Sequence, residues 1–200
     1  FLEAALAPLT DFTLSQSFED VEFVVRKGIV NRNVIEHIGN GIDTRRFIPR
    51  ADRLSLEQEL SFDPKKFRIC AVGRLVKGKG FIDLLEAFAE FHSKVKGSEL
   101  LVVGGNIPQD ISPFQKEFVD RVNSLGLQQK VRLTGITDRV EDYLAISDIF
   151  VLPSYREGVP RSLLEAMSVG IPSLATNIRG CREIISDGQN GFLFEPKYIK

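Results

Sequence analysis

Short apolar runs alternate with amphipathic stretches along this chain from residue 67 onward. Five runs have the length and the aliphatic, β-branched composition of buried strands: residues 67–72, 99–103, 131–134, 149–152 and 173–176. Each run stops at a residue that favours a turn, namely Gly73, Gly104, Gly135, Pro153 and Asn177. The pattern therefore predicts five short strands separated by turns and helices.

Apolar residues between the first two runs recur at steps of three and four, as on one face of a helix. They are Phe81, Leu84, Leu85, Phe88, Phe91 and Val95, and they predict a helix over residues 80–95. Phe118, Val122 and Leu125 predict a second helix over 114–125. Alternating strands and helices predict an α/β fold with a Rossmann-like, doubly wound parallel sheet and helices on both faces. In such sheets ligands bind beyond the carboxyl ends of the strands.

The first 66 residues follow a different pattern. Strand-like segments at 12–15 and 34–38 flank a helical stretch at 18–27, and a Gly-Asn-Gly turn follows at 39–41. The charged stretch after it, broken by Pro49 and Pro64, has room for one small helix. We expect residues 1–45 to be the end of a preceding domain with a hinge, residues 46–66 a connection, and residues 67–200 the main domain.

Composition narrows the function classes. Lys and Arg total 26 against 27 for Asp and Glu, so the net charge of -1 provides no general basic field for a nucleic acid or an anionic bilayer. The two cysteines lack the spacing of zinc ligands and suit reduced thiols in a cytosolic protein. No apolar run approaches the roughly 20 residues of a membrane-spanning helix. Because Met167 is the only methionine and the chain begins at Phe1, we expect a piece of a longer protein.

A glycine-rich turn follows the first predicted strand. It reads Gly73-Arg74-Leu75-Val76-Lys77-Gly78-Lys79-Gly80 and precedes the helix at 80–95. Backbone N–H groups at the positive end of a helix dipole, with Arg74 and Lys79 beside them, favour a phosphate ligand. The spacing also matches a Walker A loop, although Gly80 stands where the Mg²⁺-binding Ser or Thr would be. A plain turn with two solvated basic residues is the third interpretation.

Two glutamates follow the fourth predicted strand. Pro160 fits the first turn of a helix that has Leu163, Leu164 and Met167 on its apolar face and ends at Gly170. Glu157 then precedes this helix, and Glu165 lies about one turn inside it. The two carboxylates can accept hydrogen bonds from different hydroxyl pairs of one extended ligand, with a phosphate facing the amides of 159–162 between them. Structural roles, as a capping acid and a solvated helix residue, are the alternative.

The order of these motifs resembles the retaining glycosyltransferases of family 4, whose GT-B fold has two Rossmann-like domains. Glu157 and Glu165, with seven residues between them, resemble the E-x7-E motif of that family. Gly73-Arg74-Leu75 with Lys79-Gly80 resembles its G-R-L…K-G signature, and Gly39-Asn40-Gly41-Ile42-Asp43 with Phe47 and Pro49 resembles N-G-v-D…F-x-P. Segments 131–135, 148–154, 166–167, 170–172 and 190–191 follow in the family's order. The resemblance covers the chain from about Asp11 onward.

The resemblance implies roles for individual residues. Arg74 and Lys79 would bind the diphosphate, Glu165 the ribose and Glu157 the donor sugar, so that Arg74, Lys79 and Glu157 are the implied catalytic residues. The implied donor-binding set is Gly73, Arg74, Lys79, Thr137, Glu157, Gly158, Val159, Pro160, Arg161, Ser162, Leu163 and Glu165, with the backbone near Thr137 facing the base. The family's commonest form, E-G-F-G, is replaced here by Glu157-Gly158-Val159-Pro160. Two roles stay open for Arg161, a second phosphate contact or a surface ion pair.

No metal or other cofactor is expected, because no D-x-D pair occurs and the two cations can neutralise the diphosphate. His37 and His92 have no acid or nucleophile beside them in the sequence and are assigned structural roles, as is Cys70 within a strand. These three residues are therefore left out of the predicted site.

The variant motif, with Gly180-Cys181-Arg182-Glu183, is similar to bacterial capsular, exopolysaccharide and lipid-linked oligosaccharide transferases. The implied function is retaining transfer of a hexose from a nucleotide sugar, with UDP favoured, to a glycan or polyprenyl-linked acceptor in polysaccharide synthesis. The acceptor would bind to the missing N-terminal domain, so the isolated fragment would be inactive. A cytoplasmic location is implied, with peripheral attachment to the inner face of the membrane as an option. A non-catalytic nucleotide-sugar binding module and a nucleotide-sugar 2-epimerase of the same fold are the alternatives.

Overall fold

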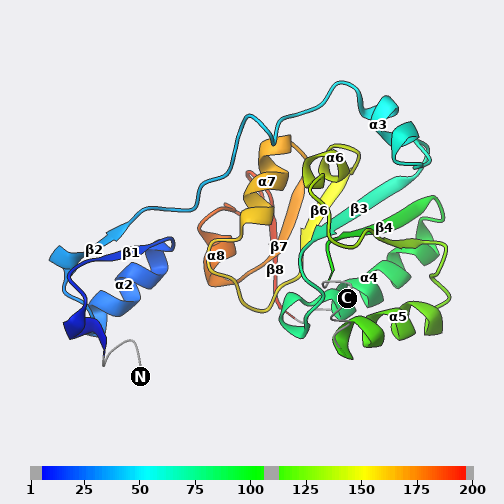
Figure 1. Cartoon of the computed structure of the whole chain (residues 1–200). Helices are drawn as coiled ribbons and strands as arrows, with labels where there is room; N and C mark the ends of the chain where they lie inside the picture. The colour runs from blue at the N-terminus through cyan, green and yellow to red at the C-terminus, as the bar shows by residue number, and fades with distance from the viewer. Residues whose placement is uncertain (1–5, 106–112, 197–200) are drawn as a thin grey trace.

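The computed structural model describes residues 6–105 and 113–196, and its largest part is a six-stranded parallel sheet (Figure 1). The strands are β3 (Phe67–Val72), β4 (Ser98–Val103), β5 (Val131–Leu133), β6 (Ile149–Leu152), β7 (Ser173–Thr176) and β8 (Phe192–Phe194). Between consecutive strands lie α4 (Phe81–Lys94), α5 (Pro113–Ser124), α6 (Val140–Ala145), α7 (Arg161–Val169) and α8 (Arg179–Arg182). The predicted Rossmann-like parallel fold is confirmed.

The order of the strands is β5-β4-β3-β6-β7-β8. The chain thus builds the sheet outward from β3 to β5, returns to the other side of β3, and builds outward again from β6 to β8. Strands β3 and β6 are parallel neighbours, with Ile69 opposite Ile149 and Cys70 opposite Phe150. At such a switch point the loops after the two strands turn toward opposite faces and leave a crevice at their carboxyl ends. The glycine-rich turn 73–80 follows β3, and the loop that carries Glu157 follows β6.

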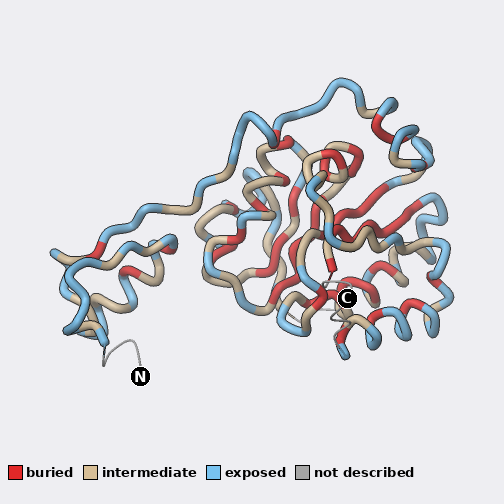
Figure 2. Tube along the Cα trace, in the orientation of Figure 1, coloured by how far each residue is buried: buried red, intermediate tan, exposed pale blue. Residues whose placement is uncertain are grey.

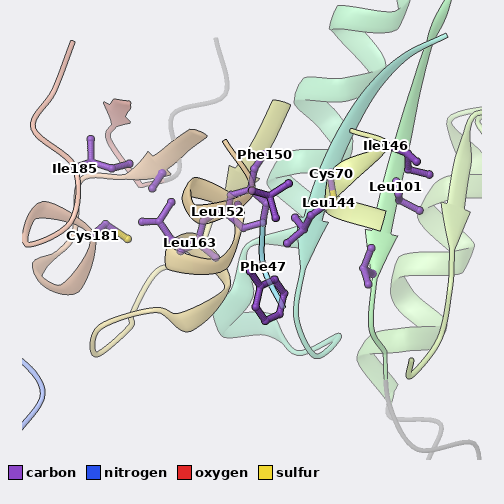
Figure 3. Packing of buried hydrophobic residues seen from close by; sticks show 14 of the residues in the cluster. Phe47, Cys70, Leu101, Leu144, Ile146, Phe150, Leu152, Leu163, Cys181 and Ile185 are labelled. Atoms are coloured by element: carbon purple, nitrogen blue, oxygen red, sulfur yellow. The ribbon is translucent and has the colours of Figure 1, made fainter. Parts of the chain in front are cut away.

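Side chains alternate between the faces of the sheet, and each face carries a buried core. Ile69 and Ala71 belong to the core that includes α4 and α5, whereas Cys70 belongs to the core that includes α6 and α7. Figure 3 shows the second core, where Phe150 and Leu152 of β6 lie beside Leu163 of α7. In Figure 2 the buried stretches concentrate in the strands of this sheet. Helices therefore cover both faces, as a doubly wound sheet requires.

A small N-terminal unit precedes this domain. Strands β1 (Thr13–Ser15) and β2 (Ile35–His37) pair in parallel, and α2 (Phe18–Arg26) connects them. An extended link then runs past the end of α7 to α3 (Arg53–Glu59) in Figure 1. Short 3-10 helices occur at Ala7–Leu9, Arg32–Val34 and Lys77–Lys79. No described helix is both long and apolar enough to cross a membrane.

The connection before β3 packs closely on the main domain. Phe47, Leu56 and Phe62 are buried in the same core as α7 (Figure 3 labels Phe47). The Ser168 hydroxyl of α7 also donates a hydrogen bond of 2.6 Å to the carbonyl of Phe47. The segment 46–66 therefore forms part of the packed domain as well as a link to the N-terminal unit.

A fully buried arginine attaches the connection to the sheet. Arg68 of β3 donates from Nε to Glu99 at 2.7 Å and from Nη1 to Glu57 of α3 at 3.0 Å. Its guanidinium carbon lies 4.5 Å from the centre of the Phe62 ring. A buried charge is tolerated when it is paired and hydrogen-bonded, so these partners keep Arg68 inside. The cluster lies near the amino end of β3, at the edge of the sheet opposite the crevice.

Two predicted helix faces need correction. Helix α7 begins at Arg161, and Pro160 occupies the N-cap position with ψ of 115° instead of the first turn. Its buried residues are Leu163, Ala166 and Val169, whereas the predicted Leu164 and Met167 are half-buried. In α4 the predicted face ends at Phe88, because Phe91 is half-buried and Val95 lies beyond the helix with 39% exposure.

Three elements of the main domain have no counterpart in the predicted pattern. They are β8 and the short helices α6 and α8, of three, six and four residues. Helices of four or six residues do not complete enough turns to show a helical period, and a strand of three residues is too short to show an apolar run. Tertiary contacts with the sheet and with α7 therefore determine them.

Candidate functional site

The two loops after β3 and β6 meet at the crevice. Gly80 adopts a left-handed conformation with φ of 67°, and a Cβ there would lie 2.0 Å from the carbonyl oxygen of Pro153. Only glycine fits such an approach without displacing backbone. The amide of Tyr155 also donates a hydrogen bond of 2.9 Å to the carbonyl of Gly78. The glycine-rich turn from β3 is thus packed against the loop from β6.

Lys79 and Glu157, one from each loop, form an ion pair where the two loops meet. The distance from Lys79 Nζ to Glu157 Oε1 is 2.6 Å, and the Ser154 hydroxyl donates to the same oxygen at 2.7 Å. The side chains are 26% and 13% exposed. No described residue hydrogen-bonds to Glu157 Oε2, so this oxygen is available to a ligand hydroxyl.

Arg74 adds a second positive charge to the glycine-rich turn. Its side chain is exposed, and it makes no ion pair or side-chain hydrogen bond with any residue in the described ranges. Gly73 comes between β3 and Arg74, and its amide donates a hydrogen bond to the carbonyl of Val103. An exposed guanidinium at the carboxyl end of a parallel strand is placed to bind an anion in the crevice.

The amino end of α7 supplies backbone donors to the same region. The loop Glu157-Gly158-Val159-Pro160 leads into the helix, and the first helical amides belong to Arg161, Ser162 and Leu163. Amides of a first turn have no partner inside the helix, and they carry the positive end of its dipole. A negatively charged group beyond Pro160 would therefore be stabilised.

Glu165 lies one turn into α7 and is half-buried. Burial raises the pKa of its carboxyl above the ordinary 4.5, and the charges of Arg161 and Arg46 only partly offset this effect. No hydrogen bond to its carboxylate occurs within 6–105 and 113–196. A desolvated carboxylate without a hydrogen-bond donor is well suited to accept from a hydroxyl pair of a ligand. Arg161 itself forms no ion pair within 4.0 Å in those ranges, so the surface ion pair considered for it is not observed there.

Thr137 lies after β5, two strands from β3. Its hydroxyl accepts a hydrogen bond of 3.1 Å from the amide of Arg139 and so shapes the start of α6. Its neighbour Ile136 is 62% exposed. The loop is connected to the Glu165 region through Arg46, which donates to the carbonyl of Asp138 and to Glu141 at 2.7 Å.

Arg46 is a site residue that the sequence interpretation missed. Its charge acts on Glu165, and its position follows from the link that runs past α7. The only sequence signal was its place inside the Asp43-to-Pro49 signature. Ser154 and Tyr155 were also missed, the first bonded to Glu157 and the second donating from its hydroxyl to Asp83 at 2.6 Å. Burial, followed by the Asp83 hydrogen bond, raises the pKa of Tyr155 to about 12, so it remains a neutral donor.

The two histidines have polar partners within the chain, and Cys70 is buried. His37 lies 3.1 Å from the carbonyl of Gln16, and His92 lies 3.0 Å from the Ser98 hydroxyl. Burial raises the pKa of Cys70 to about 12, which makes it a poor nucleophile at neutral pH. Within the described residues, no group of three or more His, Cys, Asp or Glu is arranged to hold a metal ion.

The crevice thus combines cations with hydrogen-bond acceptors. Lys79, Arg74 and the amino end of α7 favour phosphate, while Glu157 and Glu165 accept from hydroxyls. Such a site is complementary to a ligand that carries both groups. The family model described as glycosyl transferases group 1 matches residues 52–200. The chain belongs to the group 1 glycosyltransferases. A Walker A loop of a nucleoside triphosphatase is therefore set aside.

The curated relatives of this glycosyltransferase chain differ in activity. The chain is 29% identical over 199 residues to an Escherichia coli UDP-Gal:alpha-D-GlcNAc-diphosphoundecaprenol alpha-1,3-galactosyltransferase, covering 98% of this chain and 50% of that protein. It is 29% identical over 201 residues to the N-acetyl-alpha-D-glucosaminyl L-malate synthase of Bacillus anthracis, covering 96% and 50%. The chain therefore spans about half the length of the curated relatives it matches.

Solved structures show the same fold. HepE of Anabaena, in complex with UDP and glucose, superposes with a TM-score of 0.84 at 23% identity, over 96% of this chain and 51% of that one. Sucrose-phosphate synthase of Thermosynechococcus elongatus superposes with a TM-score of 0.85 at 25% identity, over 98% and 48%. The chain thus has the Rossmann-like parallel α/β fold of GT-B glycosyltransferase structures, and it matches about half of each of these two chains.

Proposed function

We propose that this glycosyltransferase chain binds a UDP-sugar in the crevice between the β3 and β6 loops. The observation that carries the proposal is the Lys79–Glu157 pair at the switch point, with Arg74 and the amino end of α7 beside it. The UDP assignment is supported by the UDP and UDP-glucose complexes of HepE and by the donor named for the E. coli relative. The site's pairing of cations with carboxylates suits a charged diphosphate joined to two hydroxylated rings.

We assign each residue of the site to one part of the nucleotide sugar. Arg74 and Lys79 bind the diphosphate and neutralise the charge that grows on it as the bond to the sugar breaks. Glu165 accepts from the ribose, and Glu157 accepts from the sugar through Oε2. Gly73, Gly158, Val159, Ser162 and Leu163 contribute backbone, Pro160 shapes the turn, and the backbone near Thr137 lies against the base. Hydrogen bonds to charged groups contribute about 1.5–3 kcal/mol each, so the two cations account for a substantial part of leaving-group stabilisation.

Of the two roles considered for Arg161, a second phosphate contact and a surface ion pair, we propose the phosphate contact. It stands at the first position of α7, is exposed, and has no ion-pair partner in the described ranges. The three cations Arg74, Lys79 and Arg161 supply the positive charge that a metal would otherwise provide, so we propose a metal-free donor site. The assignment predicts that chelators leave nucleotide binding intact.

The reaction we infer is retaining transfer of a hexose to a glycan or polyprenyl-linked acceptor, in the manner of family 4 enzymes of polysaccharide synthesis. The polyprenyl-type acceptor is supported by the diphosphoundecaprenol in the name of the E. coli relative. The acceptor would bind to an N-terminal domain of which residues 6–45 form the end. The enzyme would work in the cytoplasm at the inner face of the membrane, where a polyprenyl-linked acceptor is presented.

Ligand-detected NMR with a panel of UDP-, GDP- and ADP-sugars tests the donor assignment. Saturation transfer from this chain to UDP-sugars, and weaker transfer to the purine nucleotides, is the expected outcome. A preference for GDP-sugars would contradict the UDP assignment. Product analysis of a longer protein that contains this chain then separates transfer to an acceptor from 2-epimerisation of the sugar and from binding without turnover.

A further inference from the structure

The short helix α8 lies between the N-terminal unit and the loop Glu157-Gly158-Val159-Pro160, which we name the donor loop. On one side, a Cβ added to Gly180 of α8 would lie 1.3 Å from the carbonyl oxygen of Gly158 and 3.2 Å from the amide of Val159. Gly180 is buried, so α8 and the donor loop are in direct backbone contact. A shift of α8 must therefore move the donor loop, or break the contact with it.

On the other side, α8 is followed by its C-cap residue Glu183, whose carboxylate caps helix α2 of the N-terminal unit. Glu183 accepts hydrogen bonds from the Ser17 hydroxyl at 2.6 Å, the Phe18 amide at 2.7 Å and the Glu19 amide at 3.0 Å. Burial by itself raises the pKa of Glu183, but these hydrogen bonds outweigh burial and lower it. A carboxylate at this position also interacts favourably with the positive end of the α2 dipole.

Two ion pairs reinforce this contact. Arg179 Nη1 lies 2.6 Å from Asp20, and Arg182 Nη2 lies 3.1 Å from Glu19, so both basic residues of α8 pair with acids in the first turn of α2. These pairs are half-exposed, and each one alone contributes little. Together with the capping carboxylate they orient the whole N-terminal unit on α8.

A second connection runs through the hinge. The side-chain amide of Asn40 donates a hydrogen bond of 2.8 Å to the carbonyl of Val159 in the donor loop. Asn40 lies three residues after the end of β2, so this bond links the N-terminal unit to the donor loop without passing through α8. A pocket of about 390 Å³ separates the two connections and is lined by His37, Asn40, Val159 and Glu183.

We propose that Glu183 is a positioning residue that couples donor binding to docking of the N-terminal unit. The proposal rests on the proposed function, because the donor loop is taken as the sugar-binding loop. Docking of α2 on Glu183 holds α8 against Gly158 and keeps the donor loop in its binding conformation. By thermodynamic linkage, a ligand that occupies the donor loop must in turn favour docking. Glu183 itself stands behind the loop and does not touch the ligand.

Hydrogen exchange of the Phe18 and Glu19 amides, followed by NMR with and without UDP-glucose, tests the coupling. In the unmodified chain, saturating UDP-glucose should slow both exchange rates about fivefold or more. Glu183→Gln should abolish this ligand-dependent slowing and weaken UDP-glucose binding by a similar factor. Glu22→Gln is the matched control, because Glu22 lies on α2 and pairs with Arg32 inside the N-terminal unit. Binding of UDP-glucose with unchanged exchange, or unchanged affinity in Glu183→Gln, would overturn the coupling.

A second set of variants needs no ligand. Gly180→Ala forces α8 away from the donor loop, and Asn40→Ala removes the hinge contact. Both should speed exchange of the Phe18 and Glu19 amides, whereas Gly97→Ala, at a position with open space around it, should not. Unchanged exchange in both Asn40→Ala and a folded Gly180→Ala would overturn the coupling. If UDP-glucose does not bind to the unmodified chain, the proposed function fails, and these variants still decide whether α8 couples the two parts.

Discussion

The ammonium of Lys79 and the carboxylate of Glu157 lie 2.6 Å apart, although 78 positions separate them in the sequence. The pair joins the loop after β3 to the loop after β6, and it brings the proposed phosphate-binding cation together with the proposed sugar-binding carboxylate. Each side chain therefore has a partner before a ligand arrives. Because only Oε1 is used, Oε2 can accept from a sugar hydroxyl while the pair persists.

The two glutamates should differ in the ligands they affect. Glu165→Ala should weaken UDP and UDP-glucose alike, because both carry the ribose. Glu157→Ala should weaken only UDP-glucose, since we assign its carboxylate to the donor sugar. Each loss should be about ten- to a hundredfold, as expected for one hydrogen bond to a charged group. Isothermal titration calorimetry measures both, with Glu90→Ala on the exposed side of α4 as control. Equal losses for the two ligands in Glu157→Ala would contradict the division.

The charge of Lys79 should act on the diphosphate. Lys79→Ala should weaken UDP far more than uridine, because only UDP carries the phosphates. Lys77→Ala is the matched control, since Lys77 lies in the same turn with a side chain that is 81% exposed. UDP affinity should also fall as salt rises and survive EDTA. A requirement for Mg²⁺ would show that the three cations do not suffice.

Glu165 should make UDP binding sensitive to pH. Its pKa is raised above the ordinary 4.5 by burial, and the ionised form is the one that accepts from the ribose. As pH falls, the advantage of the native chain over Glu165→Gln should therefore have lost more than about half of its size by pH 4.5. The ratio of the two UDP affinities, measured from pH 7 downward, isolates this group from titration of the ligand. A ratio that stays constant to pH 4.5 would contradict the assignment.

The same shift has a consequence for stability. A carboxyl whose folded pKa is raised stabilises the fold below its unfolded pKa, and this contribution is lost as pH rises through the folded pKa. Glu165→Gln removes this pH-dependent contribution. Between pH 4.5 and neutrality, the free energy of unfolding of the variant should therefore fall less than that of the unmodified chain. Urea midpoints at a series of pH values measure the difference.

Arg68 should be essential for the stability of the main domain. Arg68→Met removes the buried cation from Glu57 and Glu99 and leaves them only the partly exposed Arg53 and Lys66, which should cost about 3–5 kcal/mol of unfolding free energy. Lys94→Met, which breaks an exposed pair with Glu90, should cost less than about 0.5 kcal/mol. Urea denaturation measures both. A cost below about 1 kcal/mol for Arg68→Met would show that the cluster is not held by its charges.

The 200-residue chain should bind nucleotide and show no transfer. Transfer needs the acceptor hydroxyl and the anomeric carbon held in near-attack geometry, an effect that accounts for roughly 7–11 kcal/mol of barrier lowering. The residues of the proposed donor site supply only one of the two partners. Incubation with radiolabelled UDP-sugars and polyprenyl-linked acceptors tests this prediction. Formation of a glycan product would place an acceptor site within this chain.

Local patterns in the sequence were enough to predict β3, β6 and β7 with their correct ends and helix α4 within one residue. Buried parallel strands are continuous apolar runs, and a helix of 14 residues repeats its apolar face several times. The glycine-rich turn and the two glutamates were also visible, because short-range spacing places them directly after strands. The parallel α/β fold followed from the alternation of these elements.

Contacts between distant segments were decided only by the tertiary structure. The order of strands places β3 beside β6, and this neighbour relation brings Lys79 to Glu157 and Gly80 to Pro153. The path of the link brings Arg46 to the Glu165 region, and α8 brings Glu183 to α2. None of these pairs has a local spacing rule, because their geometry depends on how the chain crosses the sheet. The sequence by itself thus determined which chemistry the loops carry, and the tertiary structure determined which groups act together.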